Sequence, residues 1–114
     1  WITIVSSAEG KQGAVNAEEA NKIMTEAGTH STARILDPSG EIGKLYDAKT
    51  TPHMFVIDKE GKIAYMGAID SDSSFKPEAI AGSTNYVMEA LNALNAGESI
   101  KVASTQPYGC GVKY

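Results

Sequence analysis

Two short apolar runs separated by a polar turn stand out in the chain, at residues 54–57 and 63–66. Both runs are rich in β-branched and aromatic side chains, which favour strands. The turn between them is Asp58-Lys59-Glu60-Gly61, and its glycine suits the left-handed position of a short hairpin loop. Pro52 precedes the first run, where a missing N–H is tolerated. The pattern predicts an antiparallel hairpin within residues 49–70.

Helical spacing of apolar residues appears before the hairpin, over residues 17–27. Asn16 and Glu19 form a capping-box pattern at its start, and Gly28 is a natural stop at its end. The sequence therefore predicts a helix from about Ala17 to Ala27. Its apolar stripe is expected to face the core and consists of Ala20, Ile23, Met24 and Ala27.

A second helix is predicted over residues 85–96, with Ser83 or Thr84 as its N-cap and Gly97 as its end. Its expected core-facing residues are Val87, Leu91 and Leu94. The turn at residues 37–40 is expected to cap a shorter helix, with Pro38 near its first position. That helix is expected to face inward with Ile42, Leu45 and Tyr46.

Two further strands are predicted, at residues 1–6 and 32–36. Alternation in the first is expected to bury Ile2 and Ile4, or the whole run if both faces are covered. Residues 71–77 are polar and indicate a surface linker, whereas Ile100 and Val102 alternate with polar residues as in an edge strand. The order of strands and helices indicates an α/β layered domain.

Composition fits one globular domain, because 42% of the 114 residues are hydrophobic and 21% are charged. The formal net charge is −4 and no basic run is present, which argues against nucleic-acid and membrane partners. No apolar stretch approaches the roughly 18 residues of a membrane-spanning helix, and the first residues lack a signal-peptide pattern. A soluble protein is expected, cytoplasmic or periplasmic, with no cofactor.

The hairpin region resembles the thioredoxin-like superfamily, and in particular its redoxin branch of alkyl hydroperoxide reductase and thiol-specific antioxidant type. The matching features are Thr51-Pro52, a strand ending in Ile57-Asp58, Gly61 in the turn and Gly67 after the second strand. The resemblance extends over residues 1–114. It implies a thioredoxin-like mixed sheet flanked by helices, and a cis bond between Thr51 and Pro52.

Enzymes of this superfamily hold a reactive cysteine at a helix N-terminus, commonly in C-x-x-C, where the helix stabilises the thiolate. Cys110 is the only cysteine of this chain, and it lies in a turn-rich tail. In the families it resembles, the attacking cysteine belongs to a strand-helix unit that precedes the segment matching Trp1. The resemblance therefore implies a single, N-terminally truncated thioredoxin-like domain over residues 1–114, without the attacking cysteine.

The resemblance also implies candidate site residues. Thr51, Pro52 and His53 are expected to bind an extended substrate peptide, and Cys110 is a candidate resolving thiol. No metal is expected, since His30, His53 and Cys110 lack metal-ligand spacing. Asp58 and Asp70 end the two hairpin strands, where turn and capping roles are commoner than paired-carboxylate catalysis.

Two functions follow as hypotheses. The chain is part of a thiol-disulfide oxidoreductase or peroxidase lineage, inactive without an attacking cysteine and acting on a protein thiol or disulfide. Alternatively, it is a non-catalytic module that binds proteins through the Thr51-Pro52 surface or an exposed sheet edge.

The resemblance also bears on assembly, because the preceding strand would lie between the strands at residues 2–6 and 54–57. Without it, three arrangements would close the gap. The two strands pair, residues 100–103 insert between them, or a second copy of the chain pairs with the open edge. We expect the third, a homodimer through an exposed sheet edge.

Overall fold

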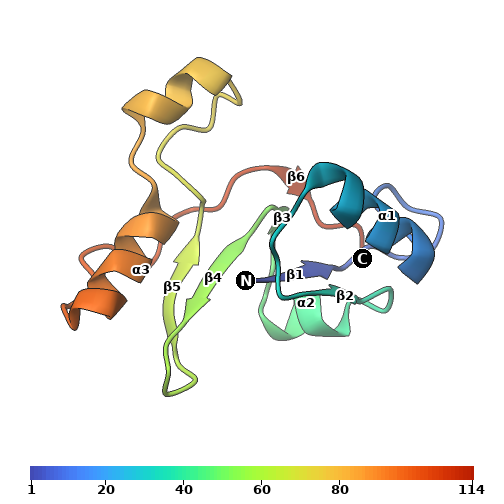
Figure 1. Cartoon of the computed structure of the whole chain (residues 1–114), viewed down its shortest axis with the longest axis horizontal. Coiled ribbons are helices and arrows are strands. Elements are labelled where there is room, and N and C mark those ends of the chain that lie inside the picture. Colours follow the sequence, from blue (N-terminus) through green and yellow to red (C-terminus); the bar gives the residue numbers. More distant parts are fainter. The chain divides into compact units, whose positions relative to one another are not determined.

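The computed structural model describes residues 1–114 and shows an α/β fold of small sheets and helices. The chain divides into two units, one of residues 1–48 with 112–114 and the other of residues 49–111. Figure 1 labels the strands and the α-helices but not the 3-10 helix η1. In chain order the elements are β1 (Ile2–Val5), α1 (Ala17–Ala27), β2 (Ala33–Leu36), α2 (Glu41–Leu45), β3 (Thr50–Thr51), β4 (Met54–Ile57), β5 (Ile63–Gly67), η1 (Pro77–Gly82), α3 (Tyr86–Ala96) and β6 (Cys110–Gly111).

In the first unit, β1 and β2 form a two-stranded parallel sheet joined by α1. Helix α1 confirms the prediction at both ends. The Asn16 side chain accepts a hydrogen bond from the Glu19 N–H at 2.8 Å, and the Glu19 carboxylate accepts one from the Asn16 N–H at 3.0 Å. Gly28 ends the helix with a φ of 62°. Local capping chemistry therefore fixes this helix.

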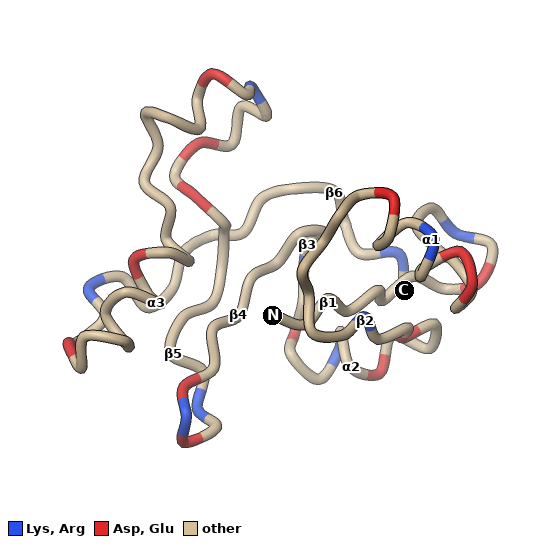
Figure 2. Tube along the Cα trace, viewed as in Figure 1, with Lys and Arg blue, Asp and Glu red and all other residues tan.

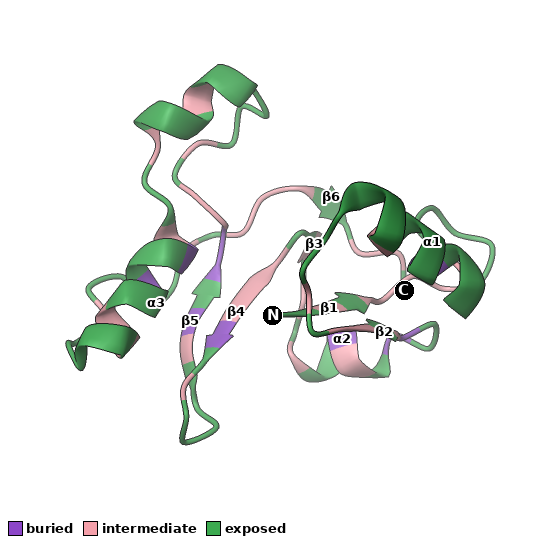
Figure 3. Cartoon of the chain, in the orientation of Figure 1, coloured by how far each residue is buried: buried purple, intermediate pink, exposed green.

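The predicted burial of the first unit is largely wrong. Of the α1 stripe only Ala20 is buried, and Ile23 is 43% exposed. In β1, Ile2 is 58% exposed and Ile4 is 40% exposed, as the colours of Figure 3 show along the strand. Burial of these side chains requires partners outside their own strand, and the sheet of this unit has two strands only.

A buried carboxylate organises the turn between β2 and α2. Asp37 is 4% exposed and accepts hydrogen bonds from the Gly43 N–H at 2.9 Å and the Ser6 hydroxyl at 2.7 Å. Burial alone would raise the pKa of Asp37, but these hydrogen bonds, with those from Ile42 and Ser39, hold it below its usual value. The carboxylate thus links the end of β1 to α2.

Two details of α2 differ from the prediction. Pro38 lies in the preceding turn, and the helix begins after Gly40, which has a φ of 72° and no side chain to cap the helix. Leu45 is 80% exposed, although the spacing predicted an inward position. The helix spans five residues, so it offers a neighbour less than two turns of surface.

In the second unit, β4 and β5 form the predicted antiparallel hairpin, with Val56 opposite Tyr65. The Asp58 carboxylate accepts hydrogen bonds from the N–H groups of Glu60 and Lys62, which confirms its turn role. Helix α3 covers one face of the hairpin. The core between them consists of Val56, Tyr65, Val87 and Ala90.

Helix α3 confirms the predicted range but not its cap or its stripe. The N-cap is Asn85, whose side chain accepts from the Met88 N–H at 2.9 Å, rather than Ser83 or Thr84. Ala90 is fully buried, while Leu91 is 36% exposed. Ala90 lies three residues after Val87, so both face the hairpin from the same side of the helix. The small side chain of Ala90 lets the helix lie close to Tyr65. The end at Gly97, with a φ of 69°, is as predicted.

Residues 100–103 form no strand. The chain instead runs along β5, where the Met66 N–H donates to the Ala103 carbonyl and the Thr105 N–H donates to the Met66 carbonyl, both at 3.1 Å. β1 and β4 belong to separate two-stranded sheets. The expected edge strand at residues 100–103 is therefore absent, and this segment lies beside β5 instead. No helix has the length and apolar character that crossing a bilayer requires.

Candidate functional site

The Thr51–Pro52 peptide bond is cis, as the resemblance implied. It follows β3 directly, and both residues are exposed. The Thr50 hydroxyl donates to the Pro52 carbonyl at 2.7 Å, and the Lys49 N–H donates to His53 Nδ1 at 3.1 Å. Local hydrogen bonds on both sides thus hold the backbone of this turn.

His53 lies against the start of the hairpin. Its ring stacks on Phe55, with centroids 4.5 Å apart and planes at 24°. The imidazole is therefore fixed by the Lys49 N–H at one nitrogen and by an aromatic face. The ring therefore packs at the strand start, and the expected role of His53 in substrate binding stays a prediction.

The tail brings Cys110 to Thr51. Strand β6 pairs antiparallel with β3, with Cys110 opposite Thr51 and Gly111 opposite Thr50. Cys110 is exposed and forms no disulfide. Thr51 and Cys110, which lie about sixty positions apart in the sequence, are thus neighbours in the second unit.

Gly109 makes this pairing sterically feasible. Its φ is 143°, and a Cβ at this position would lie 2.8 Å from the Thr51 carbonyl carbon and nearer still to its oxygen. Only glycine allows the two backbones to approach this closely in this conformation. The sequence analysis did not identify Gly109, although its place directly before the only cysteine is a signal for a close backbone approach.

Thr105 fixes the segment that leads to β6. Its hydroxyl accepts from the Ala68 N–H at 2.9 Å and shares a hydrogen bond of 2.6 Å with the Tyr65 hydroxyl, which itself donates to the Ala68 carbonyl. Burial raises the pKa of Tyr65. Since Tyr65 is fully buried in the core, these hydrogen bonds attach the tail to the core of the second unit.

Tyr108 adds a second attachment, to Asp70. The Tyr108 hydroxyl donates to Asp70 Oδ1, which also accepts from the Asp72 N–H at 3.0 Å, and this confirms the turn role of Asp70. Desolvation, followed by the hydrogen bond to Asp70 and the charges of Asp70 and Asp72, raises the pKa of Tyr108 to about 12. The phenol therefore stays protonated throughout the physiological range.

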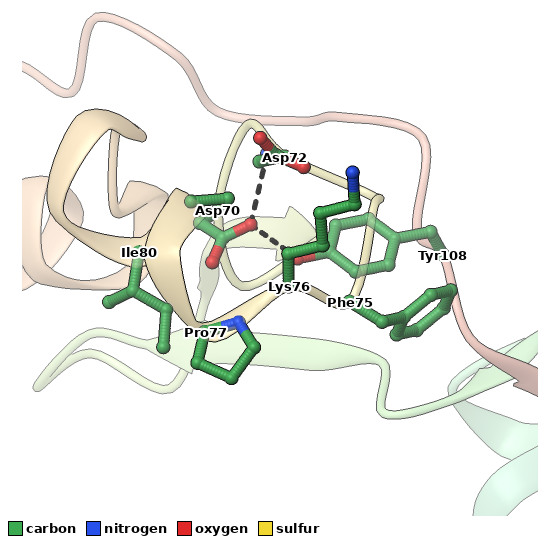
Figure 4. A pocket seen from close by; sticks show the side chains of 8 residues that line it. Asp70, Asp72, Phe75, Lys76, Pro77, Ile80 and Tyr108 are labelled. Carbon is green, nitrogen blue, oxygen red and sulfur yellow. Dashed lines mark hydrogen bonds between the residues drawn. The ribbon is translucent and has the colours of Figure 1, made fainter.

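A shallow pocket of about 250 Å³ lies beside this hydrogen bond. Figure 4 shows the Tyr108 and Phe75 rings on one side of it, meeting edge to face at 5.7 Å and 81°. Asp70, Asp72, Pro77 and Ile80 lie on the other side. The sequence analysis missed this pocket, because it assigned residues 71–77 to a linker.

The side chains that commonly bind metal ions are dispersed over the structure. No three His, Cys, Asp or Glu residues gather at one place in the structure. What the site offers is an exposed thiol on a strand that is pinned against the Thr51 backbone.

The fold and site define an α/β protein with a single exposed thiol beside a cis-proline turn. Two solved structures are similar over 99% of the chain. One is a hypothetical protein from Sinorhizobium meliloti 1021, with a TM-score of 0.80 and 22% identity, and the other is an uncharacterized conserved protein from Geobacillus kaustophilus, with a TM-score of 0.81 and 24% identity. The chain spans 60% and 58% of their respective lengths. No family model and no curated protein matches the chain.

Proposed function

We propose that the chain is part of a thioredoxin-like thiol-disulfide exchange domain of redoxin type, in which Cys110 is the resolving thiol. The observation that carries this proposal is the pairing of Cys110 with Thr51 in the β3–β6 ladder. It places the only thiol beside the backbone that, in the resembled families, faces the attacking cysteine and pairs with an extended peptide. The attacking cysteine itself is not among these 114 residues.

The proposed step is a thiol-disulfide exchange. The Cys110 thiolate attacks one sulfur of a mixed disulfide that joins an attacking cysteine to its substrate. A new S–S bond then links Cys110 to the attacking cysteine, the old S–S bond breaks, and the substrate leaves as a thiolate. The exchange is balanced without an added oxidant. The protein's contribution is to hold the thiol and the attacked sulfur in one geometry.

A second candidate, a non-catalytic protein-binding module, is favoured by the cysteine count. With one cysteine, the chain cannot cycle between a dithiol and an internal disulfide. In this alternative the Thr51-Pro52 surface binds an extended segment of another protein, and Cys110 has no role in exchange.

The test uses a model peptide whose cysteine carries glutathione as a mixed disulfide. The reduced 114-residue chain is mixed with it, and formation of the Cys110–peptide disulfide is followed by mass spectrometry. The control is a synthetic peptide of residues 106–113, which carries the same thiol without the fold.

We expect the folded chain to react roughly tenfold faster than the control peptide, because the β3–β6 pairing holds the thiol in a fixed orientation that the free tail peptide lacks. The Cys110→Ser variant should form no disulfide. Equal rates for the folded chain and the control peptide would show that the fold contributes nothing, and would contradict the redox proposal in favour of the binding module.

A further inference from the structure

The pocket beside the Tyr108–Asp70 hydrogen bond contains a carboxylate oxygen that no group of the chain uses. Asp70 is half-buried, and its Oδ1 accepts hydrogen bonds from both the Tyr108 hydroxyl and the Asp72 N–H. Its other oxygen, Oδ2, accepts no hydrogen bond and is not closed off from solvent. In Figure 4 this oxygen, which no dashed line reaches, points away from Tyr108 toward Pro77 and Ile80. The pocket therefore holds an open acceptor position.

The same pocket carries negative charge that the chain does not neutralise. Between β5 and α3 the chain has three acidic residues and one basic residue, as the colours of Figure 2 show along this segment. Neither Asp70 nor Asp72 forms an ion pair. After desolvation, the hydrogen bond to Asp70 and the charges of both carboxylates raise the pKa of Tyr108 to about 12, so their field reaches the aromatic wall. Lys76 is the basic residue, and Figure 4 shows its ammonium group pointing away from Asp70. A cation from outside the chain is thus the complementary ligand.

Aromatic and aliphatic side chains form the remaining walls, and they suit the stem of a long side chain. Phe75 is 75% exposed and meets Tyr108 edge to face, and Ile80 on the facing wall is 69% exposed. Large apolar side chains exposed around a polar centre mark interaction sites. Phe75 also has a φ of 60°, a costly conformation for a bulky residue that is concentrated at binding and switch sites.

The size of the pocket indicates what kind of molecule carries the cation. Its volume of about 250 Å³ lies below the roughly 300–1,000 Å³ of small-molecule sites. One side chain of a partner protein therefore fits this pocket better than a whole metabolite does. All the residues of the pocket belong to the second unit, so the pocket is defined within one part of the chain.

We propose that this pocket binds the ammonium group of a lysine side chain from a partner protein. The lysine stem lies along the apolar walls at Pro77 and Ile80, and the ammonium group donates to Asp70 Oδ2. The aromatic rings of Tyr108 and Phe75 add a surface that attracts a cation. No group of this site is a thiol, so the proposal does not rest on the redox role proposed above.

Lysine is favoured over arginine by the state of the Asp70 carboxylate. A guanidinium group binds best when both oxygens of one carboxylate are free to accept its two parallel N–H groups. Here Oδ1 already accepts two hydrogen bonds, which leaves one oxygen. An ammonium group is a compact charge that can bind to that single oxygen.

The test is an NMR titration of the isotope-labelled full chain, under reducing conditions, with short blocked peptides. The probe is Gly-Gly-Lys-Gly-Gly, and the control peptide carries N-acetyl-lysine at the centre, which keeps the stem and loses the charge. We expect the lysine peptide to shift amide signals within residues 70–80 and to bind at least roughly tenfold more tightly than the acetylated peptide. The corresponding arginine peptide should bind more weakly than the lysine peptide.

Variants separate the charge of Asp70 from its part in the fold. Asp70→Asn removes the charge, and Tyr108→Phe is the matched control, because it breaks the same hydrogen bond but keeps the carboxylate and an aromatic ring. We expect roughly tenfold weaker binding of the lysine peptide to Asp70→Asn, and little change for Tyr108→Phe. Lys76→Met removes the competing ammonium group and should tighten binding severalfold. The signals of β4 and β5 in the same spectra report whether each variant stays folded.

Four results would overturn the proposal. The first is a lysine peptide that shifts no signals within residues 70–80 at its solubility limit. The second is an acetylated peptide that binds as tightly as the lysine peptide, which would assign the contact to the apolar walls alone. The third is equal binding by Asp70→Asn and Tyr108→Phe. The fourth is an arginine peptide that binds more tightly than the lysine peptide, which would contradict the argument from the single free oxygen.

Discussion

Replacing Gly109 with alanine should detach β6 from β3 without unfolding the hairpin. The new Cβ would lie 2.8 Å from the Thr51 carbonyl carbon, where real Cβ contacts below 3.0 Å essentially do not occur. The Thr51 backbone cannot move away easily, because the Thr50 hydroxyl and the Lys49 N–H fix the turn beside it. The strain must therefore be relieved by movement of the tail.

The size of the effect follows from two terms. A non-glycine residue held at a φ of 143° costs about 1–3 kcal/mol. The β3–β6 ladder has only two residue pairs, and each of its hydrogen bonds contributes about 0.5–1.5 kcal/mol. The strain is thus as large as the pairing energy. We expect the open form of β6 to become dominant in Gly109→Ala, while the core of Val56, Tyr65, Val87 and Ala90 stays intact.

Hydrogen exchange measured by NMR is the appropriate assay. Amides in the β3–β6 ladder should lose protection by roughly tenfold or more, since about 1.4 kcal/mol corresponds to a factor of ten. Amides in β4 and β5 should be unchanged. Thiol exchange of Cys110 with the glutathionylated peptide should fall toward the rate of the isolated tail peptide.

The matched control is Gly111→Ala in the same short strand. A Cβ there would meet no atom within 4 Å, and its φ is not in the positive region. It should leave the ladder amides protected. Equal loss of protection in both variants, or none in Gly109→Ala, would refute the argument from close backbone approach.

Three further predictions concern the surrounding structure. Asp37→Ala should lower the free energy of unfolding in urea by about 1–3 kcal/mol, because the buried Gly43 N–H loses its acceptor, and a loss below about 0.5 kcal/mol would contradict this. Because the pKa of Asp37 is lowered in the fold, its stabilisation is present above the unfolded pKa near 3.8 and is lost as the pH falls through the folded value. Asn16→Ala should cost about 1 kcal/mol in the same assay and reduce the helical circular dichroism signal, and an unchanged signal would argue against the capping box. The pKa of Tyr108 is raised from 10.0 to about 12, so the stability it adds is complete below about pH 10 and is lost as the pH rises toward 12. Phenolate absorbance should show a tyrosine titrating near 12 that disappears in Tyr108→Phe, and a titration curve that this variant leaves unchanged near pH 12 would contradict the prediction.

Local signals in the sequence determined much of the fold. The capping box at Asn16, the stop at Gly28 and the hairpin around Gly61 all occur as predicted, because each depends on residues within a few positions of one another. Likewise, the range of α3 follows from its apolar spacing and from Gly97. The cis bond at Thr51-Pro52 came from the resemblance rather than from these local patterns.

Burial and the site were decided by the tertiary structure. Apolar alternation in β1 predicts an inward face for Ile2 and Ile4, but both side chains are exposed, because burial needs a covering layer that residues within the strand do not specify. Pairing of Cys110 with Thr51 joins segments about sixty residues apart and depends on Gly109, Thr105 and Tyr108 together. The residue pattern within either segment does not predict this pairing. Bringing together residues so far apart costs loop-closure entropy, and the contacts that offset this cost lie outside both segments.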